Sequence, residues 1–292
     1  MGFWKALLGG KDQTPEEERQ EKEQKNFDLL KYDGVKAMKI GQLDYAVRCF
    51  QEALKLTDDL EVHDYLSQVL VRQGALDAAL SEVQLLADAE PGNLSVLLRK
   101  AQIAYMMEDY ETMGDACQQA LEIAPDSAQV HFFYAQAYIG KGNGVGAIAM
   151  LTKAVTLQED YGEAYLLRGQ TLLKMGDTKG AAADAAWLLE NIGDHEDVLL
   201  FNARVAVAHQ QTEEALAFYN KVIDVNPFSI EAYYERGQLR LSQGDKSGAD
   251  EDMRKLLELN PNALADVSGE YSAEGIEQRV RQAYSAVNPL GL

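Results

Sequence analysis

A small residue recurs about every 34 positions along most of this chain, and this recurrence limits what the chain can fold into. One series is Gly34, Ser67, Ala101, Ala135, Gly169, Ala203 and Gly237. A second series is Ala46, Ala79, Met113, Ala147, Ala181, Ala215 and Ala249. In both series the first step is 33 residues and every later step is 34. Because small side chains let two helices approach closely, the paired series predict seven helical hairpins that stack on one another.

The stretch from Ile230 to Ala263 shows the unit most completely. Its signature residues are Tyr233, Gly237, Arg240, Gly244, Ala249, Met253, Leu256 and Pro261. In this pattern the stretch resembles a tetratricopeptide repeat. The resemblance implies an all-α chain, a right-handed α-solenoid of seven helix-turn-helix repeats closed by a C-terminal capping helix. The register places the repeats at 27–59, 60–93, 94–127, 128–161, 162–195, 196–229 and 230–263.

Individual repeats depart from the pattern without losing the register. Met113 takes the place of the small residue in the third repeat. Glu108 and Gln210 stand where other repeats carry the glycine of the inter-helix turn. We expect looser local packing in these repeats.

The N-terminal part, residues 1–26, precedes the repeats. It begins with an apolar segment, residues 1–10, in which Phe3, Trp4, Leu7 and Leu8 share one helical face. The segment is too short for a secretory signal or a spanning helix, so it predicts either a floppy terminus or a short anchor to a membrane or a protein. A charged lead-in follows, which predicts a solvated helix or a partly disordered stretch.

The C-terminal part, residues 264–292, follows the last repeat. It is predicted to contain an irregular connection and then a helix with one apolar stripe. Arrays of repeats need such a helix to cover the apolar face of the last unit. The stripe consists of Ile276, Val280, Ala283, Tyr284 and Val287.

Charge and cysteine usage restrict the partners and the compartment. The chain has 47 Asp and Glu residues against 27 Lys and Arg, a net charge of −20. A nucleic-acid partner is therefore excluded for want of a basic footprint, and an anionic membrane surface is disfavoured. The acidity serves either solubility or attraction to a basic partner. Cys49 and Cys117 stand at core positions with no metal-ligand spacing, which predicts reduced thiols in a cytoplasmic protein.

No cofactor, metal site or catalytic centre is predicted. Gly140, Gly142, Gly144 and Gly146 superficially resemble a phosphate cradle, but they follow a helix rather than a strand and lack the GK[ST] ending. The four histidines are scattered. An array of repeats without an inserted domain predicts a chain that is not an enzyme.

The resemblance implies a binding surface on the first helices, because members of this family line a concave groove with them. Extended peptides or partner helices bind in that groove. Five glutamines share the ninth place of their repeats, and aromatic and arginine side chains surround them. The candidate peptide-binding residues are Tyr65, Gln68, Arg72, Arg99, Gln102, Tyr105, Phe132, Phe133, Gln136, Gln170, Phe201, Arg204, Tyr234 and Gln238.

A second interpretation of these residues stays open. Glutamine is a good helix former that tolerates half-burial, and aromatics can pack between repeats. The clamp with which some members of the family hold a C-terminal carboxylate is not expected here. Lys31 is the only basic residue at the fifth place of a repeat, where that clamp has its lysine.

The predicted function is that of a non-enzymatic interaction scaffold. Its partner is a protein or peptide that presents an apolar or amphipathic segment, with basic residues to match the acidic rim. The alternative is a peripheral membrane adaptor anchored through residues 1–10.

Overall fold

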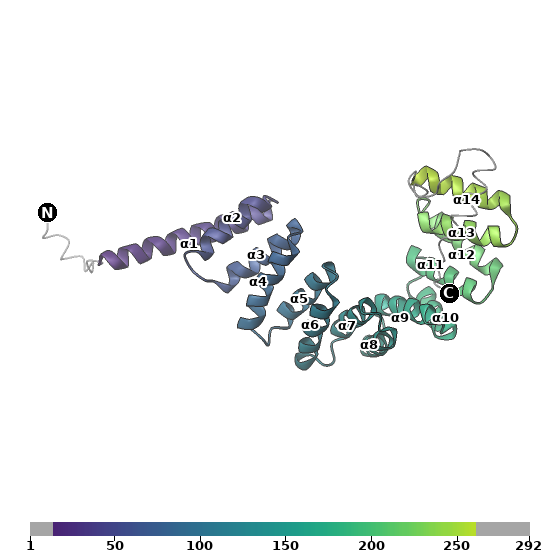
Figure 1. Cartoon of the computed structure of the whole chain (residues 1–292), viewed down its shortest axis with the longest axis horizontal. Helices are drawn as coiled ribbons and strands as arrows, with labels where there is room; N and C mark the ends of the chain where they lie inside the picture. The colour runs from purple at the N-terminus through teal and green to yellow at the C-terminus, as the bar shows by residue number, and fades with distance from the viewer. Residues whose placement is uncertain (1–13, 261–292) are drawn as a thin grey trace. The chain divides into compact units, whose positions relative to one another are not determined.

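In the computed structural model, residues 14–260 are described, and within that range every regular element is an α-helix (Figure 1). The chain divides into two compact units, Met1–Pro125 and Asp126–Leu292. The all-α repeat fold is thereby confirmed, while the limits of the terminal segments stay predictions. The apolar start of the chain and the predicted capping helix lie outside the described residues.

Fourteen helices are described, and they pair into successive hairpins. The first unit contains α1 (Pro15–Lys39), α2 (Leu43–Leu54), α3 (Leu60–Gln73), α4 (Leu76–Ala89), α5 (Leu94–Met106) and α6 (Tyr110–Ile123). The second unit contains α7 (Ala128–Gly140), α8 (Gly144–Leu157), α9 (Gly162–Lys174), α10 (Thr178–Asn191), α11 (Glu196–Ala208), α12 (Thr212–Val225), α13 (Ile230–Ser242) and α14 (Lys246–Leu259). The odd-numbered helices are the first helices of their repeats.

The turn inside each hairpin requires a left-handed backbone. Gly244 has φ 82°, and four other hairpins place a glycine in the same conformation. Glu108 and Gln210 adopt φ of 56° and 60° at this place, although their Cβ atoms disfavour it. Their departure from the pattern therefore leaves the turn intact and costs conformational energy.

The recurring small residues allow the helices to approach closely, as predicted. A Cβ on Gly34 would lie 2.5 Å from the ring of Phe50, and one on Gly169 would lie 2.4 Å from the ring of Phe201. Both phenylalanines are fully buried. The second-helix alanines are likewise fully buried, and Met113 takes their place with 1% exposure. Close helix approach thus depends on side-chain size at these positions.

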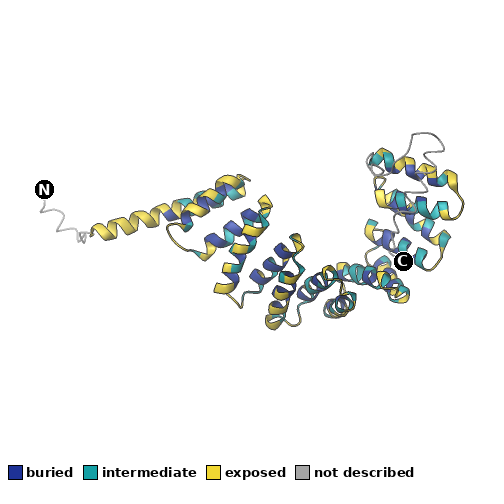
Figure 2. Ribbon diagram, viewed as in Figure 1, coloured by how far each residue is buried: buried dark blue, intermediate teal, exposed yellow. Residues whose placement is uncertain are grey.

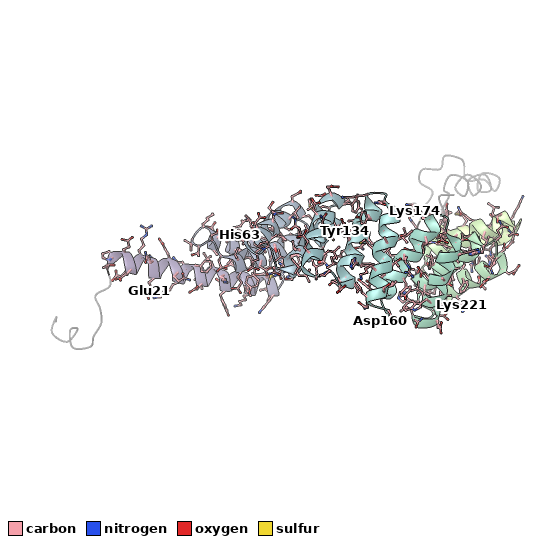
Figure 3. The ribbon with its side chains drawn as sticks, turned by 90° about the horizontal axis from the view of Figure 1, so that it is seen from below. Glu21, His63, Tyr134, Asp160, Lys174 and Lys221 are labelled. Atoms are coloured by element: carbon pink, nitrogen blue, oxygen red, sulfur yellow. The ribbon has the colours of Figure 1, made fainter. Side chains whose placement is uncertain are left out.

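Helix α1 is longer than the other first helices. Thr14 and Glu17 form a capping box at its start, and residues 14–26 are all exposed (Figure 2). Its charges pair along the helix, as when Lys25 contacts Glu21 at 2.6 Å. Figure 3 labels Glu21 on this part of the helix. The charged lead-in is therefore a solvated helix from Pro15 onward. No helix among residues 14–260 is long and apolar enough to cross a membrane.

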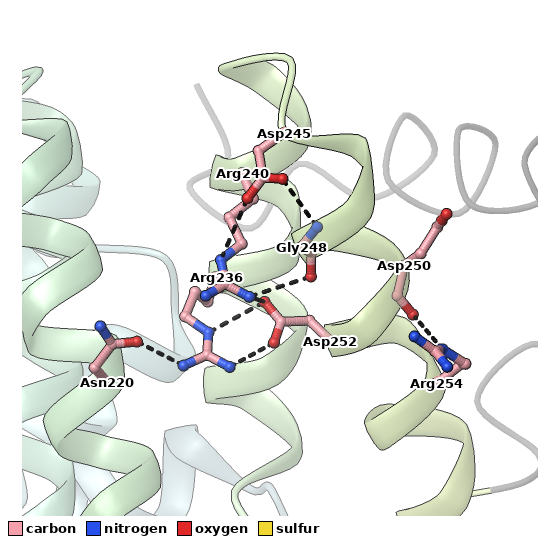
Figure 4. A network of polar contacts seen from close by, with 8 residues as sticks. All are labelled: Asn220, Arg236, Arg240, Asp245, Gly248, Asp250, Asp252 and Arg254. Atoms are coloured by element: carbon pink, nitrogen blue, oxygen red, sulfur yellow. Dashed lines mark hydrogen bonds and ion pairs between the residues drawn. The ribbon is translucent and has the colours of Figure 1, made fainter.

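Buried ion pairs brace two hairpins of the second unit. Arg236 on α13 donates two hydrogen bonds to Asp252 on α14, at 2.5 and 3.1 Å (Figure 4). Arg240 donates a third at 3.0 Å, and Asn220 on α12 accepts from Arg236 at 2.6 Å. Arg168 on α9 pairs with Asp184 on α10 in the same way. In both hairpins the arginine also lies over a tyrosine ring three residues earlier.

Candidate binding surface on the first helices

The first helices present one line of side chains that no hairpin partner covers completely. We define the first-helix surface as the second, fifth, ninth and twelfth residues of each repeat, without the buried fifth-place residues Phe132 and Leu200, and take it separately within each unit. The residues at the second place are all exposed, and five of them are acidic. Those at the ninth and twelfth places are half-buried or exposed. The surface therefore combines an acidic edge with an amide and apolar centre.

The glutamines at the ninth place lie on this surface as predicted. Gln102 is exposed, while Gln68, Gln136, Gln170 and Gln238 are half-buried. Two of them donate along their own helices, Gln68 to Asp64 at 2.7 Å and Gln238 to the hydroxyl of Tyr234 at 2.9 Å. Each primary amide carries two donors and an acceptor, so the contact made by Gln68 leaves it capacity for a partner.

An apolar line at the twelfth place escaped the sequence analysis except for Tyr105. It lies one helical turn beyond the glutamines and is half-buried except for Tyr105, which is 47% exposed. The helical spacing of three residues from each glutamine was the signal that could have revealed it. The members are Met38, Val71 and Tyr105 in the first unit and Ile139, Leu173, Val207 and Leu241 in the second.

Phe132 and Phe201 require a correction, because the structure places both in the core rather than on a surface. Phe201 is fully buried beside Gly169. Phe132 is 8% exposed, and its ring centroid lies 5.1 Å from that of Tyr161. Phe133 is half-buried and packs against the same cluster. Phe201, at the sixth place of its repeat, contacts Gly169 of the preceding hairpin, whereas Phe132, at the fifth place, packs against Tyr161 just before α9.

The three candidate arginines are held by neighbouring repeats. Arg72 donates to the backbone carbonyl of Met38 at 2.8 Å, and Arg99 pairs with Asp64. Arg204 on α11 donates to Glu235 on α13 at 2.7 and 2.9 Å. These contacts link consecutive first helices, so the guanidinium groups act first as bridges between repeats.

The pair formed by Arg204 and Glu235 is well sheltered from solvent. Glu235 is 8% exposed and also accepts a hydrogen bond from Tyr219 at 3.0 Å. Burial opposes the charge of Arg204, but the hydrogen bonds and charge of Glu235 outweigh it and raise the pKa of the guanidinium. Arg204 is therefore held in place as a charged partner of the buried Glu235 side chain.

Lys31 is engaged in the same manner. It contacts Glu61 at 2.6 Å and Asp59 at 3.1 Å. Burial opposes its charge, yet the bonds to these two carboxylates raise the pKa of Lys31, and the bond from Lys31 lowers the pKa of Glu61. With its ammonium group committed to two carboxylates, Lys31 is poorly suited to hold the carboxylate of a partner.

The three candidate tyrosines differ in their exposure and in their contacts. Tyr105 is exposed. Tyr65 stacks on Phe50 with ring centroids 5.7 Å apart and donates to Glu61 at 2.6 Å, a bond that raises the pKa of its hydroxyl. Tyr234 is half-buried, and its burial followed by the charge of Glu235 raises its pKa. The hydroxyl of Tyr65 is therefore committed to Glu61, whereas the ring of Tyr105 stays accessible to a partner.

Residues suited to metal or cofactor chemistry do not gather in the described part of the chain. Residues 14–260 contain no group of three or more His, Cys, Asp or Glu side chains placed to hold a metal ion. Cys49 and Cys117 are both buried, and burial raises the pKa of Cys117 to about 12. Gly144 lies against Met175, and Gly146 lies against Asn143 and Tyr138, so these glycines serve packing.

Known proteins resemble this chain in both sequence and fold. Residues 230–263 match the family model described as tetratricopeptide repeat. DnaJ homolog subfamily C member 3 from Gallus gallus is 22% identical over 84% of this chain and 56% of its own length. The chain spans about half or less of the length of the curated relatives it matches.

Two solved structures share the fold at low sequence identity. A tetratricopeptide repeat protein from Parabacteroides merdae ATCC 43184 is 17% identical with a TM-score of 0.69, covering 89% of this chain and 99% of its own. YrrB, a tetratricopeptide repeat protein with an unusual peptide-binding site, is 19% identical with a TM-score of 0.52, covering 64% of this chain and 97% of its own. The matched residues form the hairpin of α13 and α14, and the chain shares its helical repeat fold with these solved tetratricopeptide repeat proteins.

Proposed function

We propose that this chain is a protein-interaction scaffold whose first-helix surface holds an apolar or amphipathic segment of a partner. The observation that carries the proposal is the pairing of glutamines with half-buried apolar residues along α7, α9 and α13. Amide groups can bond a peptide backbone, and the apolar line can cover its side chains. The peptide-binding site of YrrB, which has a similar fold, supports this role by analogy.

Selection from a random peptide display library on the full chain tests the proposal. Enriched peptides should carry apolar residues at regular spacing, and they should lose most of their affinity for a Gln136→Arg/Gln170→Arg variant. The substituted residues lie on α7 and α9, where longer charged side chains would block the surface without entering the core.

The matched control is Gln51→Arg/Gln118→Arg, which makes the same exchange at exposed places on the second helices α2 and α6. This variant should bind the selected peptides as the unaltered chain does. Equal binding by both double variants would show that the first-helix surface is not the site.

A second candidate, the membrane adaptor, draws support from the exposed part of α1. Residues 15–26 form an exposed stretch of helix about 18 Å long, at 1.5 Å per residue, before the first hairpin. Flotation of the full chain with neutral and anionic liposomes tests this candidate against a variant with serine at Phe3, Trp4, Leu7 and Leu8. Equal flotation of the two proteins would eliminate the anchor.

A further inference from the structure

An open pocket of about 490 Å³ lies in the second unit, where the first helices α9 and α11 begin and α10 ends. Its volume is in the range of ligand-binding pockets. It lies beside the first-helix surface and includes Leu166 from the fifth place of that surface. The pocket could not be predicted from the pattern of a single repeat, because its walls come from three consecutive repeats.

The interior of the pocket is apolar. Leu188 and Val198 are almost fully buried, Leu166 is half-buried, and Ile192 stays 47% exposed at the mouth. Gly162 allows this opening, because a Cβ there would lie 3.0 Å from the Cδ1 atom of Ile192. Covering the half-exposed Ile192 with an apolar side chain of a partner would remove apolar surface from water and so favour binding.

Tyr161 forms one wall and is fixed from behind. Its ring centroid lies 5.1 Å from that of Phe132, which belongs to the core. Burial and then the charge of Glu163 raise the pKa of its phenol. The wall is therefore a rigid aromatic face with a neutral hydroxyl, as suits the contact of an apolar side chain.

The rim of the pocket is acidic. Glu163 on α9 and Asp197 on α11 are exposed, and each is the second residue of its helix. Asp197 lies 3.9 Å from the ring of His195, which is itself largely exposed. Within the described residues the pocket lining contains these two carboxylates and neither lysine nor arginine. The net charge of the whole chain, −20, adds to this negative field.

We infer that this pocket receives one large apolar side chain of a partner peptide, leucine or phenylalanine, while a lysine or arginine next to it in the peptide pairs with Glu163 and Asp197. The inference rests on the proposed scaffold function and specifies its partner: a basic segment with an isolated large apolar residue. Charge complementarity identifies the occupant, since an acidic segment would be repelled at the rim.

Synthetic fluorescent peptides in a glycine and serine background test the inference with the full chain. One peptide carries a leucine followed by two lysines, a second has serine for the leucine, and a third has glutamates for the lysines. The first peptide should bind at least about tenfold more tightly than the other two. Comparable affinities for all three would overturn the inference.

Charge reversal on the protein supplies the matched variants. Glu163→Lys/Asp197→Lys should weaken binding of the leucine–lysine peptide about tenfold and strengthen binding of the leucine–glutamate peptide. Glu214→Lys/Asp224→Lys introduces the same charges at exposed places on α12 and should leave both affinities unchanged. The inference fails if the two double variants respond alike, because the effect would then be one of overall charge.

Methyl-labelled NMR of the full chain locates the bound leucine and separates this inference from the scaffold function. Addition of the leucine–lysine peptide should shift the methyl resonances of Leu166, Ile192 and Val198. Shifts at Leu173 and Val207 without these would overturn the pocket and leave the scaffold function standing. If no resonance shifted, the inference that the pocket binds the leucine would also be wrong. The peptide display selection tests the scaffold function separately.

Discussion

The two units of this chain secure their helices with charged side chains that differ in burial. In the first unit, Lys31 and Asp59 are paired at 3.1 Å with 22% and 29% of their side chains exposed. In the second, Arg236 and Asp252 are paired at 2.5 Å with 12% and 2% exposed. The first pair joins α1 to the capping residue of α3, whereas the second joins the two helices of one hairpin.

This difference in burial determines which charged pairs stabilise the fold and which mainly set the charge of the surface. Half-exposed pairs contribute little to stability, because water screens them. A buried pair is costly to break, because the remaining partner keeps its charge without compensation. In the second unit, Arg168 and Arg236 are turned into their hairpins, which leaves amides and apolar residues on the first-helix surface.

The largest expected effect comes from Asp252→Ala compared with Asp64→Ala in the first unit. Removal of Asp252 leaves two arginines without their carboxylate and should lower the free energy of unfolding of the second unit by about 3–5 kcal/mol. Removal of Asp64, which pairs with the half-exposed Arg99, should cost about 1 kcal/mol or less. Hydrogen exchange of the amides in each unit measures both.

Asp250→Ala on the exposed face of α14 is the control, with an expected change within about 0.5 kcal/mol. If Asp252→Ala and Asp64→Ala lowered the free energy of unfolding by similar amounts, burial would not explain the difference between the charged pairs of the two units.

The next effect should be the same in both units, because it depends on helix approach rather than on charge. Gly34→Ala and Gly169→Ala should each cost about 1–3 kcal/mol, since the new methyl group would overlap the ring of Phe50 or Phe201. Urea unfolding followed by circular dichroism measures the loss. Phe201→Leu should recover part of the cost of Gly169→Ala, and a double variant no more stable than Gly169→Ala would argue against the overlap.

A smaller gain is expected at the two strained turns, one in each unit. Glu108→Gly and Gln210→Gly should each raise the free energy of unfolding by roughly 0.5–1 kcal/mol, because glycine adopts positive φ without strain. The reverse exchange, Gly244→Ala, meets no neighbouring atom within 4 Å and should lose a comparable amount through its φ of 82° alone. Thermal unfolding of the three variants checks both signs, and a loss in the glycine variants would show that the turns are not strained.

The smallest effect concerns His63, which ties the first unit together in a pH-dependent way. Its Nε2 lies 2.8 Å from Asp58, and its Nδ1 contacts Glu82. Burial opposes the charge, but the hydrogen bonds to Glu82 and Asp58 outweigh it and raise the pKa of His63. A raised pKa means that the stabilisation is full below the ordinary value of about 6.5 and is lost as pH rises through the higher folded-state value.

Hydrogen exchange of α3 and α4, corrected for intrinsic rates, should therefore show the first unit loosening between pH 6 and 9. His63→Gln should flatten this dependence, because the amide does not titrate. An unchanged pH dependence in the variant would assign the effect to other groups.

The periodic pattern predicted the hairpins because close packing of the helices depends on side-chain size at fixed places of the repeat. Gly34 and Gly169 show the cause directly, since any larger residue would enter a phenylalanine ring of the same or the next hairpin. The turns also follow from local chemistry, as the φ values of Gly244, Glu108 and Gln210 show. Position in the 34-residue register was therefore enough to place these residues in the fold.

The repeat register predicted the glutamines on the first-helix surface, but it did not show which neighbouring side chains remain accessible there. Phe132 and Phe201 were predicted on the surface, yet both are buried. Phe132 at the fifth place and Phe201 at the sixth place of their repeats both pack against neighbouring hairpins. Arg204 has its carboxylate partner 31 residues away. Such contacts depend on how one hairpin is rotated on the next, which helical spacing within a single repeat does not encode.

The sequence by itself determined the repeat, its register and the helices that carry the candidate surface, because these follow from local size and periodicity. Tertiary structure decided which charges are buried and which are half-exposed, and it alone assembled the pocket of Leu166, Leu188 and Val198. The physical reason is that burial of a side chain is a property of the space between repeats, and that space forms only when separate hairpins pack together.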